Sequence, residues 1–139
     1  MTNHARRRFL VGAGALAGAA LPVFAAPTAY NKPPTGTVGL LHVVYFWLKK
    51  PDSAADRAAL IAGLQTLAEI PSVRSLQIGV PASTEQRAVV DNSFQVSELM
   101  MFDDVAGQNA YQEHPIHKQF VANCEHLWQR VVVYDSQVV

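Results

Sequence analysis

A phenol and two imidazoles lie within seven residues near the C-terminal end of the chain, in Tyr111, His114 and His117. An imidazole, with an ordinary pKa of about 6.5, can accept a proton near neutral pH, whereas a phenol, at about 10, stays protonated and donates hydrogen bonds. These residue types together are the components of a proton-transfer site. The structural alternative is that His114 caps a helix, while Tyr111 and His117 pack with their polar ends at the surface.

Pro115 indicates how these side chains are positioned. Proline lacks a backbone donor and has φ fixed near its helical value, so it is typical of the first turn of a helix. A stripe of apolar residues at helical spacing then predicts a helix from Pro115 to about His126: Phe120, Val121, Cys124, Leu127 and Trp128. Tyr111 would therefore end one helix, His114 would lie at the junction, and His117 would open the next.

The preceding chain supplies strands and a further helix. Residues 39–48 are mostly β-branched or aromatic and predict a buried strand in which His42 is the one polar side chain. Asp52 or Ser53 is the candidate cap for a helix that ends before Pro71. We expect strands at 73–80, 94–102 and 131–135, a polar loop at 81–93 with a short edge segment at Val89 and Val90, and a helix capped by Asp103 or Asp104. This order predicts an α+β fold, the ferredoxin-like split βαβ arrangement with an antiparallel sheet.

The first strand is apolar on both faces, since Val44 and Phe46 alternate with Val43 and Trp47. A strand with one solvated face should instead alternate apolar and polar residues. We therefore expect the second face of the sheet to meet another sheet, most simply in a symmetric homodimer that forms an α/β barrel.

The N-terminus has the pattern of a twin-arginine export signal. Arg6, Arg7 and Arg8 are followed by Phe-Leu and a short Ala/Gly-rich apolar run. Small residues favour cleavage after Ala25, which gives a signal peptide at 1–25 and a periplasmic or secreted protein exported by the twin-arginine machinery. The alternative is an uncleaved membrane anchor, but the run is short for a span of about 20 residues.

Composition limits the rest of the chain. Residues 26–37 are rich in proline and lack periodicity, so they predict a linker, and 38–139 are long enough for one domain. The 11 basic and 11 acidic residues balance, but without the three N-terminal arginines 8 basic residues face 11 acidic ones. This excess of acidic residues argues against nucleic acid as a partner. Cys124 is the only cysteine, which excludes an intrachain disulfide and suggests a small buried apolar residue.

These elements resemble the stress-responsive dimeric α/β-barrel (Dabb) domain family over about residues 38–136. The resemblance is carried by His42 on an apolar first strand, Ile70-Pro71-Ser72-Val73, Phe102-Asp103-Asp104, the element from Tyr111 to His117, Phe120-Val121 and the terminal Val133-Tyr134-Asp135. It implies a ferredoxin-like fold whose sheets pack into a barrel across a dimer interface.

The resemblance also implies roles for single residues. A characterised relative, the plant olivetolic acid cyclase, uses a Tyr and a His of this element in the aldol cyclisation of a linear polyketide. By this comparison His117 would be the catalytic base and Tyr111 its hydrogen-bond donor, with His42 lining the same cavity. We also take His42 and His114 as candidate ligand-binding residues. The resemblance implies no cofactor.

Three classes of function remain open. One is a cyclase-like or lyase-like enzyme acting on a hydrophobic or aromatic compound, and the second is a stress-protective or structural homodimer without turnover. The third is a metal site built from His42, His114 and His117, which lacks a carboxylate at convincing spacing, so we expect no metal. Glu98, in a predicted strand, is expected to pair with a neighbour or with a cation of a partner chain.

Overall fold

The computed structural model of the protein describes residues 38–139. The predicted signal peptide (1–25) and linker (26–37) lie outside the described residues. Within 38–139, no helix combines the length and the apolar character that crossing a membrane requires.

The described chain forms four strands and three α-helices. In chain order these are β1 (Leu40–Leu48), α1 (Ala54–Thr66), β2 (Ser75–Gly79), β3 (Val96–Phe102), α2 (Val105–Glu113), α3 (Pro115–Cys124) and β4 (Trp128–Gln137). Short 3-10 turns, Leu67–Glu69 and Glu125–Leu127, extend α1 and α3. This order confirms the predicted ferredoxin-like α+β fold.

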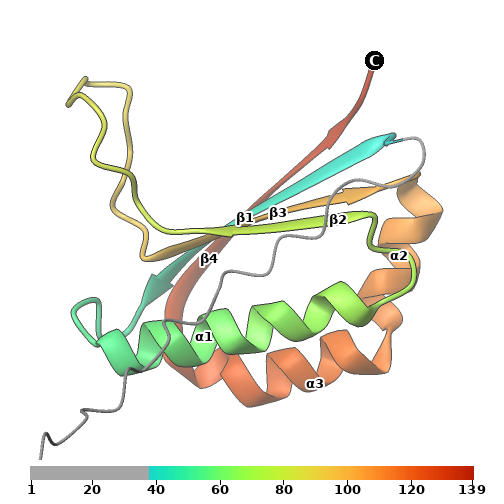
Figure 1. Cartoon of the computed structure of the whole chain (residues 1–139), viewed down its shortest axis with the longest axis horizontal. Coiled ribbons are helices and arrows are strands. Elements are labelled where there is room, and N and C mark those ends of the chain that lie inside the picture. Colours follow the sequence, from blue (N-terminus) through green and yellow to red (C-terminus); the bar gives the residue numbers. More distant parts are fainter. Residues whose placement is uncertain (1–37) are drawn as a thin grey trace, which may run out of the picture.

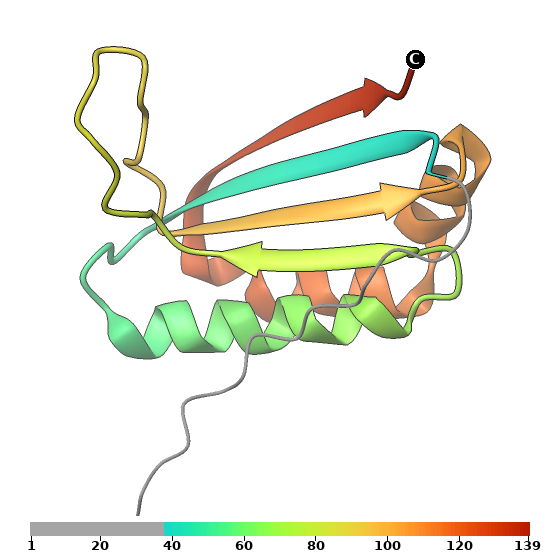
Figure 2. The same cartoon turned by 45° about the horizontal axis from the view of Figure 1, so that its top comes forward.

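The strands form one antiparallel sheet in the order β2-β3-β1-β4. Figures 1 and 2 show α1 and α3 lying side by side against one face of this sheet, with α2 at one end. The opposite face is left without a helical layer. The loop between β2 and β3 projects away from the helices beyond the end of the sheet (Figure 1).

Local signals in the sequence account for the helix boundaries. The Ser53 hydroxyl accepts a hydrogen bond from the amide of Asp56, 3.1 Å away, and so caps α1. The Asp104 carboxylate caps α2 in the same way through the amide of Gly107, at 2.8 Å. Pro115 occupies the first turn of α3, where a backbone donor would have no partner within the helix.

Gly63 lets α1 and α3 approach each other closely. A Cβ at this position would lie 2.5 Å from Sγ of Cys124 and 3.2 Å from the ring of Phe120. Cys124 is itself buried in the core, as the sequence predicts.

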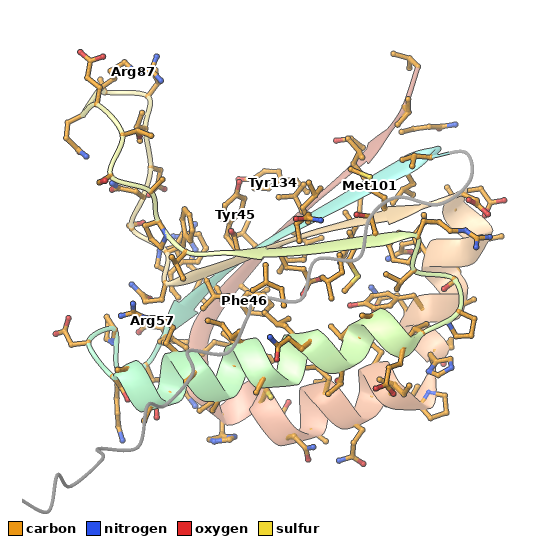
Figure 3. All side chains as sticks on the ribbon, in the orientation of Figure 1. Tyr45, Phe46, Arg57, Arg87, Met101 and Tyr134 are labelled. Carbon is orange, nitrogen blue, oxygen red and sulfur yellow. The ribbon has the colours of Figure 1, made fainter. Side chains whose placement is uncertain are left out.

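The two faces of the sheet differ in what they contact. On β1, His42, Val44, Phe46 and Leu48 are buried against the helices, while the alternate residues face the uncovered side and are only partly buried. Figure 3 shows Phe46 directed toward the helical layer and Tyr45, Met101 and Tyr134 directed away from it.

Several details of the predicted strands were wrong: the second strand, expected at 73–80, is shorter and spans Ser75–Gly79. Val89 and Val90 belong to a turn in the loop rather than to an edge segment, and Phe94 precedes β3. The chain joins the sheet only at Val96. The Phe94 ring, just before the strand, packs on Tyr45 with the ring centroids 4.8 Å apart. β4 is longer than 131–135, since it pairs with the whole of β1.

Candidate functional site

A cavity of about 160 Å³ lies between the helix-facing side of the sheet and residues of α2 and α3. Four titratable side chains line it: His42 from β1, Glu98 from β3, Tyr111 from α2 and His117 from α3. The remaining wall is mostly apolar, and includes Val44, Phe46, Phe120, Trp128, Val131 and Val133. A dry cavity of about 150 Å³ can hold one benzene molecule, so this cavity suits a ligand with a single ring.

His117 is oriented by the chain itself. Its Nδ1 lies 3.1 Å from the backbone carbonyl oxygen of Gln112. A carbonyl can only accept, so Nδ1 carries the proton and donates it, which leaves Nε2 with a free lone pair. Burial lowers the pKa of His117 and the nearby His42 lowers it further, although the Gln112 carbonyl and Glu113 act in the opposite direction. The ring is therefore neutral at pH 7 and has a nitrogen able to accept a proton.

Tyr111 lies beside His117 and is almost completely buried. The centroids of the two rings are 4.5 Å apart, and the Tyr111 ring also packs on Phe102, at 5.3 Å, and edge-on to His42, at 5.8 Å. Burial, together with the negative charge of Glu98, raises the pKa of Tyr111 above its ordinary value. The phenol consequently keeps its proton and remains a hydrogen-bond donor.

His42 is fixed from the neighbouring strand. β1 and β4 pair so that His42 lies opposite Asp135, and its Nδ1 is 2.6 Å from Oδ1 of that residue. Because the carboxylate accepts, Nδ1–H of His42 donates this hydrogen bond. Asp135 thus sets the orientation of the ring.

Glu98 is buried on the helix-facing side of β3, with 2% of its surface exposed. Its Oε2 has no hydrogen-bond partner among the described residues. Burial raises the pKa of this carboxyl to about 8, so it is largely protonated at neutral pH.

The structure thus brings together His42, Tyr111 and His117, as the sequence analysis expected. It does not bring His114 into the cavity. The ring of His114 caps α3, with Nδ1 accepting from the amide of Ile116 at 3.2 Å, which is the structural alternative that the sequence allowed. Within residues 38–139, no group of three His, Cys, Asp or Glu side chains is arranged to hold a metal ion.

The sequence did not reveal that two further carboxylates lie in or beside the site. Asp135 was noticed only as part of a terminal motif, and its contact with His42 spans 93 residues of sequence. Glu98 was expected to pair with a neighbour or with a cation of a partner chain, and among the described residues its Oε2 has no hydrogen-bond partner. The available signal was a lone carboxylate in an otherwise apolar strand face, where an unpaired charge is costly.

Three solved structures share this fold. A hydroxynitrile lyase from Passiflora edulis is 20% identical, with a TM-score of 0.62, over 75% of this chain and 96% of that chain. A Dabb family protein from Mesorhizobium loti is also 20% identical, with a TM-score of 0.60, over 74% and 99% of the two chains. A dimeric ferredoxin-like protein from Jannaschia sp. CCS1 is 26% identical, with a TM-score of 0.55, over 71% and 98%. No curated protein matches the sequence.

The sequence itself identifies the family. The model of the stress responsive A/B barrel domain, Dabb, matches residues 40–138, which run from the first residue of β1 to just past the end of β4. The match therefore includes all four strands, all three helices and every residue that lines the cavity. On this evidence the chain belongs to the stress-responsive A/B barrel (Dabb) family.

Proposed function

We propose that this protein binds a small hydrophobic or aromatic carbonyl compound in the cavity and catalyses proton transfer at the carbon next to the carbonyl. The observation that carries the proposal is the orientation of His117. Its Nδ1 is held by the Gln112 carbonyl oxygen, and its ring lies against Tyr111. A base with a free nitrogen thus adjoins a protonated donor in an apolar pocket, where electrostatic interactions are stronger than in water.

The reaction would begin with proton abstraction. Nε2 of His117 takes the proton from the α-carbon, the C–H electron pair forms the C=C bond of the enolate, and the carbonyl π pair moves to oxygen. The Tyr111 hydroxyl donates a hydrogen bond to that oxygen as its negative charge develops. Return of a proton from His117 regenerates the ketone, whereas attack of the enolate on a second carbonyl would give cyclase-like chemistry.

The experiment is hydrogen exchange of acetophenone in D₂O. We expect the mature protein to exchange the methyl protons faster than buffer alone, with loss of the methyl signal followed by NMR. His117→Ala should abolish the acceleration, while His126→Ala, which changes an exposed histidine outside the cavity, should retain it. Acetophenone binding without accelerated exchange would favour the alternative of a non-catalytic stress-protective or structural protein.

The active form in this proposal is a homodimer. The uncovered face of the sheet carries Leu41, Val43, Leu99 and Met101, which are only partly buried in a single chain, and Tyr134, which is 59% exposed. A second copy is the occupant favoured here, because an apolar sheet face is best covered by an identical face and the related Jannaschia protein is described as dimeric.

Size-exclusion chromatography with light scattering tests the dimer. Wild type should have twice the mass of one chain, and Val43→Lys should dissociate it by placing an unpaired charge in the interface. Gln119→Lys, on the exposed side of α3, should remain dimeric. A wild-type monomer at micromolar concentration would contradict the proposal.

Export by the twin-arginine route to the periplasm or beyond also belongs to this proposal. The signal that supports it, Arg6-Arg7-Arg8-Phe9-Leu10, lies outside the described residues. Replacing Arg6 and Arg7 together with Lys should retain the precursor in the cytoplasm, whereas the unchanged chain should yield a mature protein that begins at Ala26. Normal export of the double variant would exclude this route.

A further inference from the structure

The carboxyl of Glu98 lies at the wall of the cavity. It is 2% exposed, and its Oε2 has no hydrogen bond among the described residues. Leaving a buried polar group unpaired costs free energy, so such groups in native proteins usually serve a binding or catalytic role, or contact water or an ion. The side chain therefore requires an explanation that the fold alone does not supply.

Its surroundings indicate what it can bind. Glu98 pairs with Val44 on β1, and the next residue of β1 on the same face is His42. Tyr111 is close enough for the charge of Glu98 to affect its hydroxyl. Since His117 lines the same cavity, the base, the phenol and the carboxyl surround one small volume.

We propose that Glu98 in its acid form is the second hydrogen-bond donor of the cavity and, with Tyr111, binds the oxygen of a neutral carbonyl ligand. This assignment rests on the proposed function and specifies its ligand class as ketones or aldehydes rather than carboxylate anions. The described residues that line the cavity include no Lys or Arg to attract an anion. An ionised Glu98 would also repel one.

The carboxyl would act without losing its proton. When His117 removes the α-proton of the ligand, negative charge moves to the ligand oxygen, which accepts stronger hydrogen bonds from Glu98 and Tyr111. A protonated carboxyl beside a phenol is an arrangement known to stabilise an enolate oxygen in an apolar site. Both donors keep their protons throughout, so no further reactant is needed.

Paired ligands provide the test of this role. Acetophenone and α-methylstyrene have nearly the same shape, but α-methylstyrene has a CH₂ group in place of the carbonyl oxygen. Ligand-observed NMR would give the affinity of each for wild type, Glu98→Leu, Glu98→Gln and the exposed-loop control Glu85→Gln. Circular dichroism would establish that each variant is folded, which we expect of Glu98→Leu because it removes a buried polar group.

Wild type should prefer the ketone. In Glu98→Leu this preference should fall about tenfold, as expected for loss of one buried hydrogen bond. Glu98→Gln should keep it within about threefold, because the amide N–H can still donate, and Glu85→Gln should leave it unchanged. Infrared spectra of acetophenone labelled with ¹³C at the carbonyl should show a smaller downshift of the C=O stretch when bound to Glu98→Leu than when bound to wild type.

The outcomes separate this inference from the proposed function. An undiminished preference for the ketone in Glu98→Leu would overturn the role of Glu98, while exchange dependent on His117 could still be present. Equal binding of both ligands by wild type would also overturn it. If the preference of wild type for the ketone falls in Glu98→Leu but wild type does not exchange the ketone's protons, the role of Glu98 as a donor is supported and proton transfer by His117 is rejected.

Discussion

Replacing Glu98 with Gln should make the protein more stable at alkaline pH, and the size of the effect follows from the pKa of the buried carboxyl. Folding raises that pKa from 4.5 to about 8. At roughly 1.4 kcal/mol per pKa unit, this corresponds to about 4 to 5 kcal/mol of stability. The amide of Gln has nearly the same shape and does not titrate.

The sign of the pH dependence follows from the two states. Below about pH 4.5 Glu98 is protonated in both the folded and the unfolded chain, so it carries no ionisation penalty. As the pH rises from 4.5 to 8, the unfolded chain gains free energy by ionising while the folded chain keeps its proton, and stability is lost. Above pH 8 both states are ionised and the loss is complete.

Neighbouring groups must be separated from this effect. The cavity also contains His42, which is paired with Asp135, and contains His117 and Tyr111. His117 has a lowered pKa, so its contribution reduces the stability of the protein as the pH falls below 6.5. This pH dependence is opposite in sign to that of Glu98. Tyr111, whose pKa is raised, does not titrate in this range. These contributions are present in wild type and in Glu98→Gln, so the difference between the two proteins isolates Glu98.

Urea denaturation followed by circular dichroism at pH 4.5, 6.5 and 8 measures the difference, at one fixed protein concentration. Wild type and Glu98→Gln should be similar at pH 4.5, with the variant more stable by about 4 kcal/mol at pH 8. The exposed-loop control Glu85→Gln should follow wild type. Parallel pH profiles for wild type and Glu98→Gln would refute the argument, since Glu98 would then be ionised and solvated or paired in the folded protein.

Three further substitutions test packing, capping and catalysis. Gly63→Ala gains about 1 kcal/mol of helix propensity, but its Cβ would lie 2.5 Å from Sγ of Cys124. Because overpacking costs about 1 to 3 kcal/mol, we expect a net loss of stability in urea, and a stabilised variant would show that α1 and α3 separate freely. Asp104→Ala should lower the free energy of unfolding by about 1 kcal/mol through loss of the hydrogen bond to Gly107, while Asp104→Asn should largely preserve it. Tyr111→Phe should weaken acetophenone binding by up to about tenfold, as expected for loss of one buried hydrogen bond, and should slow exchange of the bound ketone by at least about a further tenfold, because that bond strengthens when charge develops on oxygen. Equal effects on binding and on exchange would indicate a ground-state or structural role.

Local sequence signals determined the secondary structure and the family. Ser53 and Asp104 each accept a hydrogen bond from a helix amide three residues away, and Pro115 constrains its own backbone, so these boundaries depend only on near neighbours. The apolar pattern of β1 likewise predicted a strand with two apolar faces, of which the described chain buries one and leaves the other only partly buried. Phe94 was predicted to belong to β3 but precedes it, since a pattern of residue types does not reveal where the chain enters the sheet.

The site required the tertiary structure. The sequence placed Tyr111 and His117 together because they flank one helix junction, and it allowed His114 either a ligand contact or a capping role, of which the fold shows the cap. Asp135 orients His42 only because β4 pairs with β1 in a register that brings together residues 93 positions apart. The carboxyl of Glu98 keeps its proton near neutral pH only because folding removes it from water. Burial and long-range pairing are properties of the packed sheet and helices, and no short stretch of residues contains them.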